Sequence, residues 1–243
     1  MIGLIVGSGM QDLSLESARA QSVDTPFGTA QVLCGTLAQK PVALIERHGK
    51  NHCLAPHQVP SRANIWAMKS LDVKSILATG TVGGMSGDHA PGHLSVPNQI
   101  VDYTVGRESS FWGTPGFEST HIDFTEPFDE ALRAALLEAG KALKIFVTDG
   151  GVYACTQGPR LETAAEVRRM IMDGCDMVGM TAMPEAALAR ELGIGYGLLC
   201  ASVNWAAGLS GTALTWDEIR QSMQKVCRYM QAVLAQAVAR LPE

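Results

Sequence analysis

Three short segments of this sequence could bind an anion, and each comes at the end of a short apolar run. The segments are Gly7-Ser8-Gly9, Arg47-His48-Gly49 and Thr79-Gly80-Thr81-Val82-Gly83-Gly84. Glycines let backbone amides converge on an anion, hydroxyls add donors, and an arginine can donate two parallel hydrogen bonds to phosphate. A tight turn would explain any one glycine segment equally well. Together the three segments favour a phosphate site, because the ends of parallel strands meet at one edge of a sheet.

A histidine cluster around the second segment raises a metal site as an alternative. His48, His52 and His57 lie close together in the sequence. The cluster lacks the ligand spacing of a zinc site, and solvated histidines beside a surface arginine would also explain it. We therefore expect phosphate rather than a metal ion here.

Three further segments carry polar groups that could contact the rest of a ligand. Gln157 to Thr163 combines a Gly-Pro turn with Glu162 at the expected start of a helix, where a glutamate often only complements the helix dipole. Gly179-Met180-Thr181 ends another apolar run. Asn204 lies in a long charge-free stretch, where a buried amide needs partners for its oxygen and its nitrogen. Asn204 therefore either caps a loop or contacts a ligand.

The composition is that of a globular protein. Of 243 residues 47% are hydrophobic, and 19 basic against 24 acidic residues give a net charge of −5. This balance indicates neither nucleic-acid binding nor a membrane surface as partner. The six cysteines form no C-x-x-C pair, which indicates reduced thiols in a cytoplasmic protein. The charge-free stretch from Leu192 to Trp216 could span a bilayer by length, but its glycines and hydroxyls favour a buried strand and a polar loop.

Short apolar runs alternate with helical patterns along the chain. Strands are expected at Ile2–Val6, Val42–Glu46, Ser75–Thr79, Gln99–Tyr103, Gly151–Cys155, Met177–Met180 and Tyr196–Val203. Helices are expected at Ser61–Leu71, Glu126–Leu143, Glu162–Asp173, Pro184–Leu192 and Trp216–Leu241, the last with a capping box of Thr215 and Glu218. This alternation predicts an α/β fold, a three-layer sandwich with a mostly parallel, mixed central sheet, in a single domain covering residues 1–243.

Several longer strings are specific in combination. They are RHG at Arg47, NIWAMK from Asn64 to Lys69, HIDFTEPF from His121 to Phe128, GVYACTQGPRLET and DMVGMTAMPEAALARELGI. Taken in order, they resemble the trimeric purine nucleoside phosphorylase family, and most closely its branch of 5′-methylthioadenosine and 5′-methylthioinosine phosphorylases. The resemblance runs from Gly3 to the last helix and implies the purine nucleoside phosphorylase fold.

The resemblance implies a role for each matching position. Phosphate would be bound by Ser8, Arg47, His48, Gly80, Thr81 and Thr181, although many relatives carry alanine where this chain has Thr81. Met180 would lie against the ribose, and Glu162 and Asn204 would face the purine as the catalytic residues. Further substrate contacts would come from Leu161, Trp205, Ala206, Leu214 and Trp216. His121 would reach the 5′ end of the substrate in an adjacent subunit, which implies a homotrimer.

The implied reaction is phosphorolysis of a purine nucleoside, with phosphate as co-substrate and without a metal or an organic cofactor. The amide nitrogen of Asn204 can donate to O6 of a purine, and Glu162 can accept from N1–H, so this pair suits a 6-oxopurine. Relatives that cleave 6-aminopurines tend to carry aspartate at the position of Asn204 and again two residues on, where this chain has Ala206.

The 5′ substituent is the least constrained part of the expected substrate. The segment from residue 205 to 216 holds no histidine and no charge, and its Leu209, Leu214 and Trp216 either pack a methylthio group or anchor the last helix. We expect phosphorolysis of S-methyl-5′-thioinosine to hypoxanthine and 5-methylthioribose 1-phosphate, in purine salvage. The alternatives are an inosine/guanosine phosphorylase, a methylthioadenosine phosphorylase, a nucleosidase that uses water, and a purine-binding scaffold.

Overall fold

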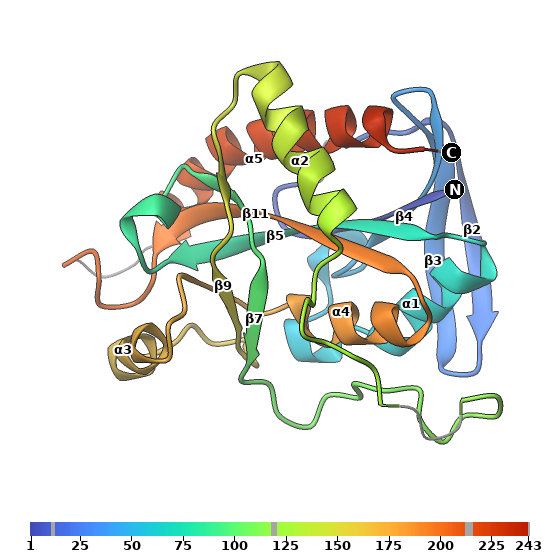
Figure 1. Cartoon of the computed structure of the whole chain (residues 1–243), viewed down its shortest axis with the longest axis horizontal. Coiled ribbons are helices and arrows are strands. Elements are labelled where there is room, and N and C mark those ends of the chain that lie inside the picture. The colour runs from blue at the N-terminus through green and yellow to red at the C-terminus, as the bar shows by residue number, and fades with distance from the viewer. Residues whose placement is uncertain (11–12, 118–120, 212–215, 243) are drawn as a thin grey trace.

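A computed structural model describes residues 1–10, 13–117, 121–211 and 216–242, with the backbone alone at 216–221. Within these residues eleven strands form one mixed sheet, and helices cover both of its faces (Figure 1). The α/β class and the mixed central sheet expected from the sequence are thereby confirmed. None of the described helices combines the length and the apolar composition needed to cross a lipid bilayer.

The strands follow one another along the chain with helices inserted between them. They are β1 (Ile2–Val6), β2 (Glu16–Thr25), β3 (Gly28–Leu37), β4 (Lys40–Glu46), β5 (Ser75–Gly84), β6 (Leu94–Val96), β7 (Gln99–Asp102), β8 (Val147–Asp149), β9 (Val152–Cys155), β10 (Met177–Gly179) and β11 (Gly195–Trp205). The main path through the sheet runs β2-β3-β4-β1-β5-β10-β9-β7, and β11 pairs with β5 and β6 outside this path.

Two apolar cores lie on the two faces of the sheet. The helices are α1 (Ser61–Ser70), α2 (Glu130–Leu143), α3 (Ala164–Met172), α4 (Ala182–Glu191) and α5 (Trp216–Arg240). Apolar side chains of α1 and α4 pack into one core, and those of α2 and α5 pack into the other (Figure 1). Helix α3 packs separately, over β9 and β10. The burial of apolar area on both faces is what fixes the sheet between its helices.

The arrangement around β5 opens the sheet at one place. On one edge, β5 pairs with β11 along its whole length. On the other edge, β1 pairs with residues 75–78 and β10 pairs with residues 83–84. Among the described strands, none pairs with residues 79–82 on this second edge. The ends of β1 and β10 therefore leave a gap beside the middle of β5, and backbone and side-chain groups there are accessible to a ligand.

The sequence missed the hairpin of β2 and β3 and the short strands β6 and β8. Strand β2 is exposed along most of its length, so it lacks the apolar alternation that reveals a strand. Strands β6 and β8 have three residues each, too few for any periodicity. Strand β5 also continues to Gly84, so the segment expected as a loop after Thr79 is strand.

Three helix starts also differ from the expectation, and helix α4 begins at Ala182 rather than at Pro184. Helix α2 begins at Glu130, because the side chain of Asp129 caps it by accepting from the backbone N–H of Leu132 at 3.0 Å. Helix α3 begins at Ala164 rather than at Glu162, because Thr163 is its N-cap and forms the capping box with Glu166. The capping box expected of Thr215 and Glu218 lies outside the described residues.

Candidate active site

A cavity of about 620 Å³ lies at the gap beside β5. Its walls come from the residues that follow β1, β4, β9 and β10, from β5 and β11, and from Met223 of α5. The predicted residues that line it are Ser8, Arg47, His48, Gly80, Thr81, Leu161, Glu162, Met180, Thr181, Asn204 and Ala206. Segments almost 200 residues apart in the sequence therefore meet in one cavity, as the convergence of strand ends predicts.

The remaining predicted residues lie elsewhere or cannot be placed. Trp205 does not line the cavity, although Asn204 before it and Ala206 after it do. His121 is exposed and packs its ring against Trp112, with 5.4 Å between the ring centroids. Leu214 and the side chain of Trp216 lie outside the described residues.

Arg47 is the most deeply buried charge in the cavity wall. It and Glu185 of α4 are each only 1% exposed. Nε of Arg47 donates to Oε1 of Glu185 at 2.6 Å, Nη2 donates to Oε2 at 2.9 Å, and Nη1 donates to the carbonyl oxygen of Thr79 at 2.6 Å. Burial alone would lower the pKa of Arg47, but the charge and hydrogen bonds of Glu185 outweigh it and raise the pKa.

This geometry fixes how Arg47 can meet a ligand. A guanidinium has five N–H donors, and three of those of Arg47 are taken by Glu185 and Thr79. One hydrogen on Nη1 and one on Nη2 remain, which is the number needed for a two-pronged contact with an anion. Gly7 lies against this group, since a Cβ there would come within 2.8 Å of Nη1. The charge of Arg47, however, is already balanced by Glu185.

His48 is held in one ring orientation. Its Nδ1 lies 2.9 Å from the carbonyl oxygen of Leu54, and its ring stacks on His52 with 4.2 Å between the centroids. Burial, opposed in part by the bond to Leu54, lowers the pKa of His48 to about 4, so the ring is neutral near pH 7. A carbonyl can only accept, so Nδ1 carries the proton and Nε2 presents a lone pair.

Glu162 lies before helix α3 and is not the glutamate that interacts with the N-terminus of this helix. The first turn of α3 is capped instead by Glu166, which accepts from the backbone N–H of Thr163 at 2.7 Å and pairs with Arg160. The bond with Arg160 is the main cause that lowers the pKa of Glu166 to about 2. Glu162 precedes the helix, accepts a hydrogen bond of 2.6 Å from Oγ1 of Thr156, and lines the cavity. The helix-dipole explanation of Glu162 is therefore replaced by one that involves the cavity.

Asn204 lies at an irregularity of β11, where the register against β5 shifts between Ser202 and Asn204. Its Nδ2 donates to the carbonyl oxygen of Trp205 at 2.7 Å, which uses one of the two amide hydrogens. Gly83 lies beneath it, since a Cβ there would meet Nδ2 of Asn204 and Cα of Ala206 at 3.3 Å. The bulge and the glycine together leave room for a flat ligand edge beside the amide.

Several lining residues were missed by the sequence reasoning. His52 stood in the histidine cluster but received no role, and Leu54, Ala55 and Pro56 follow it along the cavity wall. Met223 belongs to the apolar stripe of α5, a pattern that core packing explains by itself. Across the described residues, no group of three or more His, Cys, Asp or Glu side chains is arranged to hold a metal ion.

Comparison with known proteins places this chain in a family. Residues 1–239 match the family model described as "Phosphorylase superfamily". The chain is 45% identical to a probable S-methyl-5′-thioinosine phosphorylase of Pseudomonas syringae pv. tomato, with 97% of each chain covered. It is 40% identical to a 6-oxopurine nucleoside phosphorylase of Pyrococcus furiosus, covering 100% of this chain and 93% of the other.

Solved structures agree with these relatives. A methylthioadenosine phosphorylase from Schistosoma mansoni in complex with adenine superposes with a TM-score of 0.91 at 31% sequence identity, over 98% of this chain and 90% of the other. A methylthioadenosine phosphorylase from an antarctic soil metagenomic library gives the same TM-score at 32% identity. The match extends over both cores and the whole sheet, so the chain belongs to the phosphorylase superfamily.

Proposed function

We propose that the protein is a pentosyltransferase that cleaves S-methyl-5′-thioinosine with phosphate, giving hypoxanthine and 5-methylthioribose 1-phosphate. The observation that carries the proposal is the cavity beside β5, where an arginine with two remaining donors faces the same space as Glu162 and Asn204. Relatives named as S-methyl-5′-thioinosine phosphorylases, at 43–45% identity over most of the chain, support the choice of substrate.

Phosphate would occupy the end of the cavity nearest β1. Donors there are the two remaining hydrogens of Arg47, the hydroxyls of Ser8, Thr81 and Thr181, and backbone amides near Gly80. A side chain at position 80 would lie 3.7 Å from Oγ1 of Thr181, so these two residues are neighbours. Neutral His48 would accept a hydrogen bond through Nε2 from the hydroxyl of monohydrogen phosphate, which would orient the unprotonated oxygens toward the sugar.

The purine and the ribose would fill the rest of the cavity. One phosphate oxygen would form a bond to C1′ while the bond from C1′ to N9 breaks and its electron pair passes to the purine. The proton lost by phosphate balances the proton that the purine gains. Asn204 and Glu162 would stabilise the leaving base, and Met180 would lie against the ribose. Since phosphate is the nucleophile, the reaction as proposed uses no metal or organic cofactor.

The base preference follows from complementary hydrogen bonding. The second amide hydrogen of Asn204 can reach O6 of hypoxanthine, and the Glu162 carboxylate can accept from N1–H. Adenine has neither group, and each mismatched buried polar group costs on the order of 1–3 kcal/mol. Ala206 supplies no hydrogen-bonding side chain that could serve a 6-amino group. An inosine/guanosine phosphorylase remains the second candidate, favoured by the relative from Pyrococcus furiosus.

The 5′ substituent and the assembly belong to the same proposal. Leu214 and Trp216 would pack the methylthio group, and His121 would reach it from an adjacent subunit of a homotrimer. In the isolated chain, the exposed His121 ring and Trp112, which is 52% exposed, form a surface pair suited to such a contact. The proposal also places the enzyme in the cytoplasm, on the basis of its unpaired cysteines.

A substrate panel tests this function. The protein is incubated with inosine, adenosine and their 5′-methylthio forms, with and without phosphate, and base release is followed. We expect phosphate-dependent release of hypoxanthine, with kcat/KM for 5′-methylthioinosine at least about tenfold above that for inosine, since a methylthio group that fills an apolar pocket gains about 1–3 kcal/mol over a poorly paired hydroxyl. Equal efficiency on the two substrates would favour the inosine/guanosine enzyme. Release without phosphate would identify a nucleosidase, and saturable binding without release would identify a purine-binding scaffold.

A further inference from the structure

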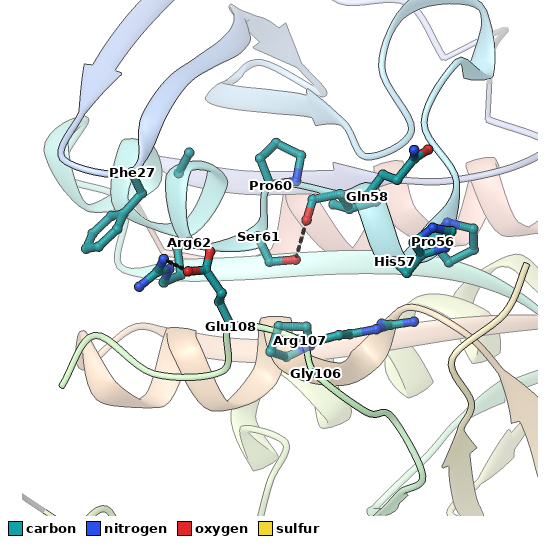
Figure 2. Close-up of a pocket in the computed structure, with 13 residues that line it drawn as sticks. Phe27, Pro56, His57, Gln58, Pro60, Ser61, Arg62, Gly106, Arg107 and Glu108 are labelled. Carbon is teal, nitrogen blue, oxygen red and sulfur yellow. Dashed lines mark hydrogen bonds and ion pairs between the residues drawn. The ribbon is translucent and has the colours of Figure 1, made fainter.

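A second cavity, of about 310 Å³, lies beside the active site (Figure 2). Pro56 lines both cavities. Figure 2 shows Arg62 and Glu108 paired at one end of this second cavity, and Arg107 extending below Pro56 and His57 at the other. Arg107 follows β7, in a segment to which the expected chemistry gives no role.

The guanidinium of Arg107 has a partner for every N–H it carries. Nε donates to Oε1 of Gln157 at 3.2 Å. Nη1 donates to the carbonyl oxygens of Met180 at 2.8 Å and Met183 at 2.6 Å. Nη2 donates to the carbonyl oxygens of Thr156 at 3.1 Å and Gln157 at 2.9 Å. A guanidinium has five donors, so all are used. These acceptors are neutral, unlike the carboxylate that holds Arg47.

These acceptors belong to the two loops that form one side of the active site. Thr156 and Gln157 follow β9, and Oγ1 of Thr156 holds the carboxylate of Glu162. Met180 and Met183 lie where β10 passes into α4, and Met180 lines the active-site cavity. The two loops are also joined where they begin, because the backbone N–H of Thr156 donates to the carbonyl oxygen of Gly179, the last residue of β10, at 2.8 Å.

The segment that carries Arg107 is itself attached to the first of these loops. The backbone N–H of Val105 donates to Oε1 of Gln157 at 3.1 Å, the same oxygen that accepts from Nε of Arg107. Arg107 is therefore anchored by its own backbone segment and bridges the loops as a rigid, planar group. A lysine could not reproduce this bridge, because its ammonium donates from a single point.

We propose that Arg107 is a positioning residue of the active site. It sets the distance between the loop that holds Glu162 against the base and the loop that holds Met180 against the ribose. This inference rests on the proposed function for the roles of Glu162 and Met180. Arg107 lines the second cavity and not the active-site cavity, so we infer that it acts through the oxygen atoms that it binds and not by contact with the substrate.

The test compares Arg107→Gln and Arg107→Lys with Arg62→Gln as matched control. Arg62 lines the same cavity and carries the same charge, but its ion pair is with Glu108 and not with the two loops. We expect Arg107→Gln to raise KM for the nucleoside about 10- to 100-fold, because misplacement of a binding group by about 1 Å has an effect of this size. KM for phosphate should rise as well, because Thr181 lies between the Met180 and Met183 carbonyls that Arg107 binds, and Arg107→Lys should recover activity only in part. Arg62→Gln should retain the wild-type KM values.

A second measurement follows amide hydrogen exchange in the whole protein without substrate. Exchange at residues 156–157 and 180–183 should become faster in Arg107→Gln and not in Arg62→Gln. The inference is wrong if Arg107→Gln keeps the wild-type KM values and exchange, if Arg107→Lys restores full activity, or if Arg62→Gln matches Arg107→Gln. The wild-type substrate panel decides the proposed function separately. If the wild type cleaves another nucleoside, the variants are compared on that nucleoside, and if it cleaves none, hydrogen exchange decides.

Discussion

Replacement of Glu185 by glutamine tests the charge balance beneath the proposed phosphate site. Glu185 and Arg47 are both 1% exposed and share two hydrogen bonds of 2.6 and 2.9 Å. The hydroxyl of Tyr196 also donates to Oε2 of Glu185, at 2.9 Å. Glu185→Gln keeps the shape of the side chain but removes its charge and replaces one acceptor oxygen by a donor. If the NH₂ group takes the place of Oε2, Arg47 Nη2 and the Tyr196 hydroxyl both lose their acceptor. If the amide is turned over and the NH₂ group takes the place of Oε1, Arg47 Nε loses its acceptor.

The expected loss of stability is large for a change of one atom. Removal of one partner from a buried ion pair costs about 3–5 kcal/mol, because the other charge stays buried without compensation. Glutamine retains one acceptor for Arg47, so we expect the lower end, about 3 kcal/mol, or roughly a hundredfold in the folding equilibrium. The freed guanidinium would also turn from its present orientation, and kcat/KM for phosphate should fall at least about tenfold.

Urea unfolding at fixed protein concentration measures the first effect, and initial rates at varied phosphate measure the second. Glu108→Gln is the control, since it removes a carboxylate that is 71% exposed in its pair with Arg62, and exposed pairs contribute about 0–1 kcal/mol. If Glu185→Gln unfolds within about 1 kcal/mol of the wild type and keeps its KM for phosphate, Glu185 does not hold Arg47 in place for phosphate.

Three further predictions concern the base, the pH response and the assembly. Asn204→Asp should lower kcat/KM for 6-oxopurine nucleosides about 10- to 100-fold by removal of the amide donor, and unchanged turnover of inosine-type substrates would exclude this contact. Because burial holds the folded-state pKa of His48 at about 4, below its usual 6.5, stability should decline as pH falls through this range. His48→Asn should reduce that decline in the free energy of unfolding by up to about 3 kcal/mol, measured by urea unfolding between pH 7 and pH 4. If the free energy of unfolding falls equally with pH in both proteins, the decline belongs to other groups. Sedimentation should show a trimer, and co-expression of His121→Ala with Asn204→Ala should restore activity in mixed trimers, whereas mixtures that stay inactive would remove His121 from the neighbouring site.

The sequence predicted the elements that are marked by a continuous apolar run or by an apolar stripe with helical spacing. The buried strand β1 has the predicted bounds, and α5 begins at the predicted Trp216. The hairpin of β2 and β3 was not predicted, since β2 is exposed along most of its length and only a few residues of the hairpin, among them Val23 and Val32, reach the core. Helix starts were less certain, because the capping side chains decide them, as Asp129 and Thr163 do here.

The convergence of site residues was predictable because it depends only on strand direction. The hydrogen-bond and ion-pair partners of the site residues were not predictable, because they come from distant parts of the chain. Arg47 and Glu185 are 138 positions apart, and nothing in either local sequence indicates that they meet. For Glu162 the decisive fact is the neighbouring Glu166, whose carboxylate already caps α3. Two glutamates four residues apart look alike in the sequence, and only the position of the helix start separates their roles.

The pairing of Arg47 with Glu185 also changes how the anion site should be understood. An isolated buried arginine would attract phosphate by its net charge, but here the neighbouring carboxylate cancels that charge at a distance of 2.6 Å. At the proposed phosphate site the attraction would then come from oriented donors: two guanidinium hydrogens, the hydroxyls of Ser8, Thr81 and Thr181, and the amides of β5. Such donors are directional, so in the proposed reaction they would hold phosphate in one orientation for attack on C1′. In the proposed reaction, a charge-balanced site would also allow phosphate and the phosphorylated product to leave, because an uncompensated buried charge would hold neither of them.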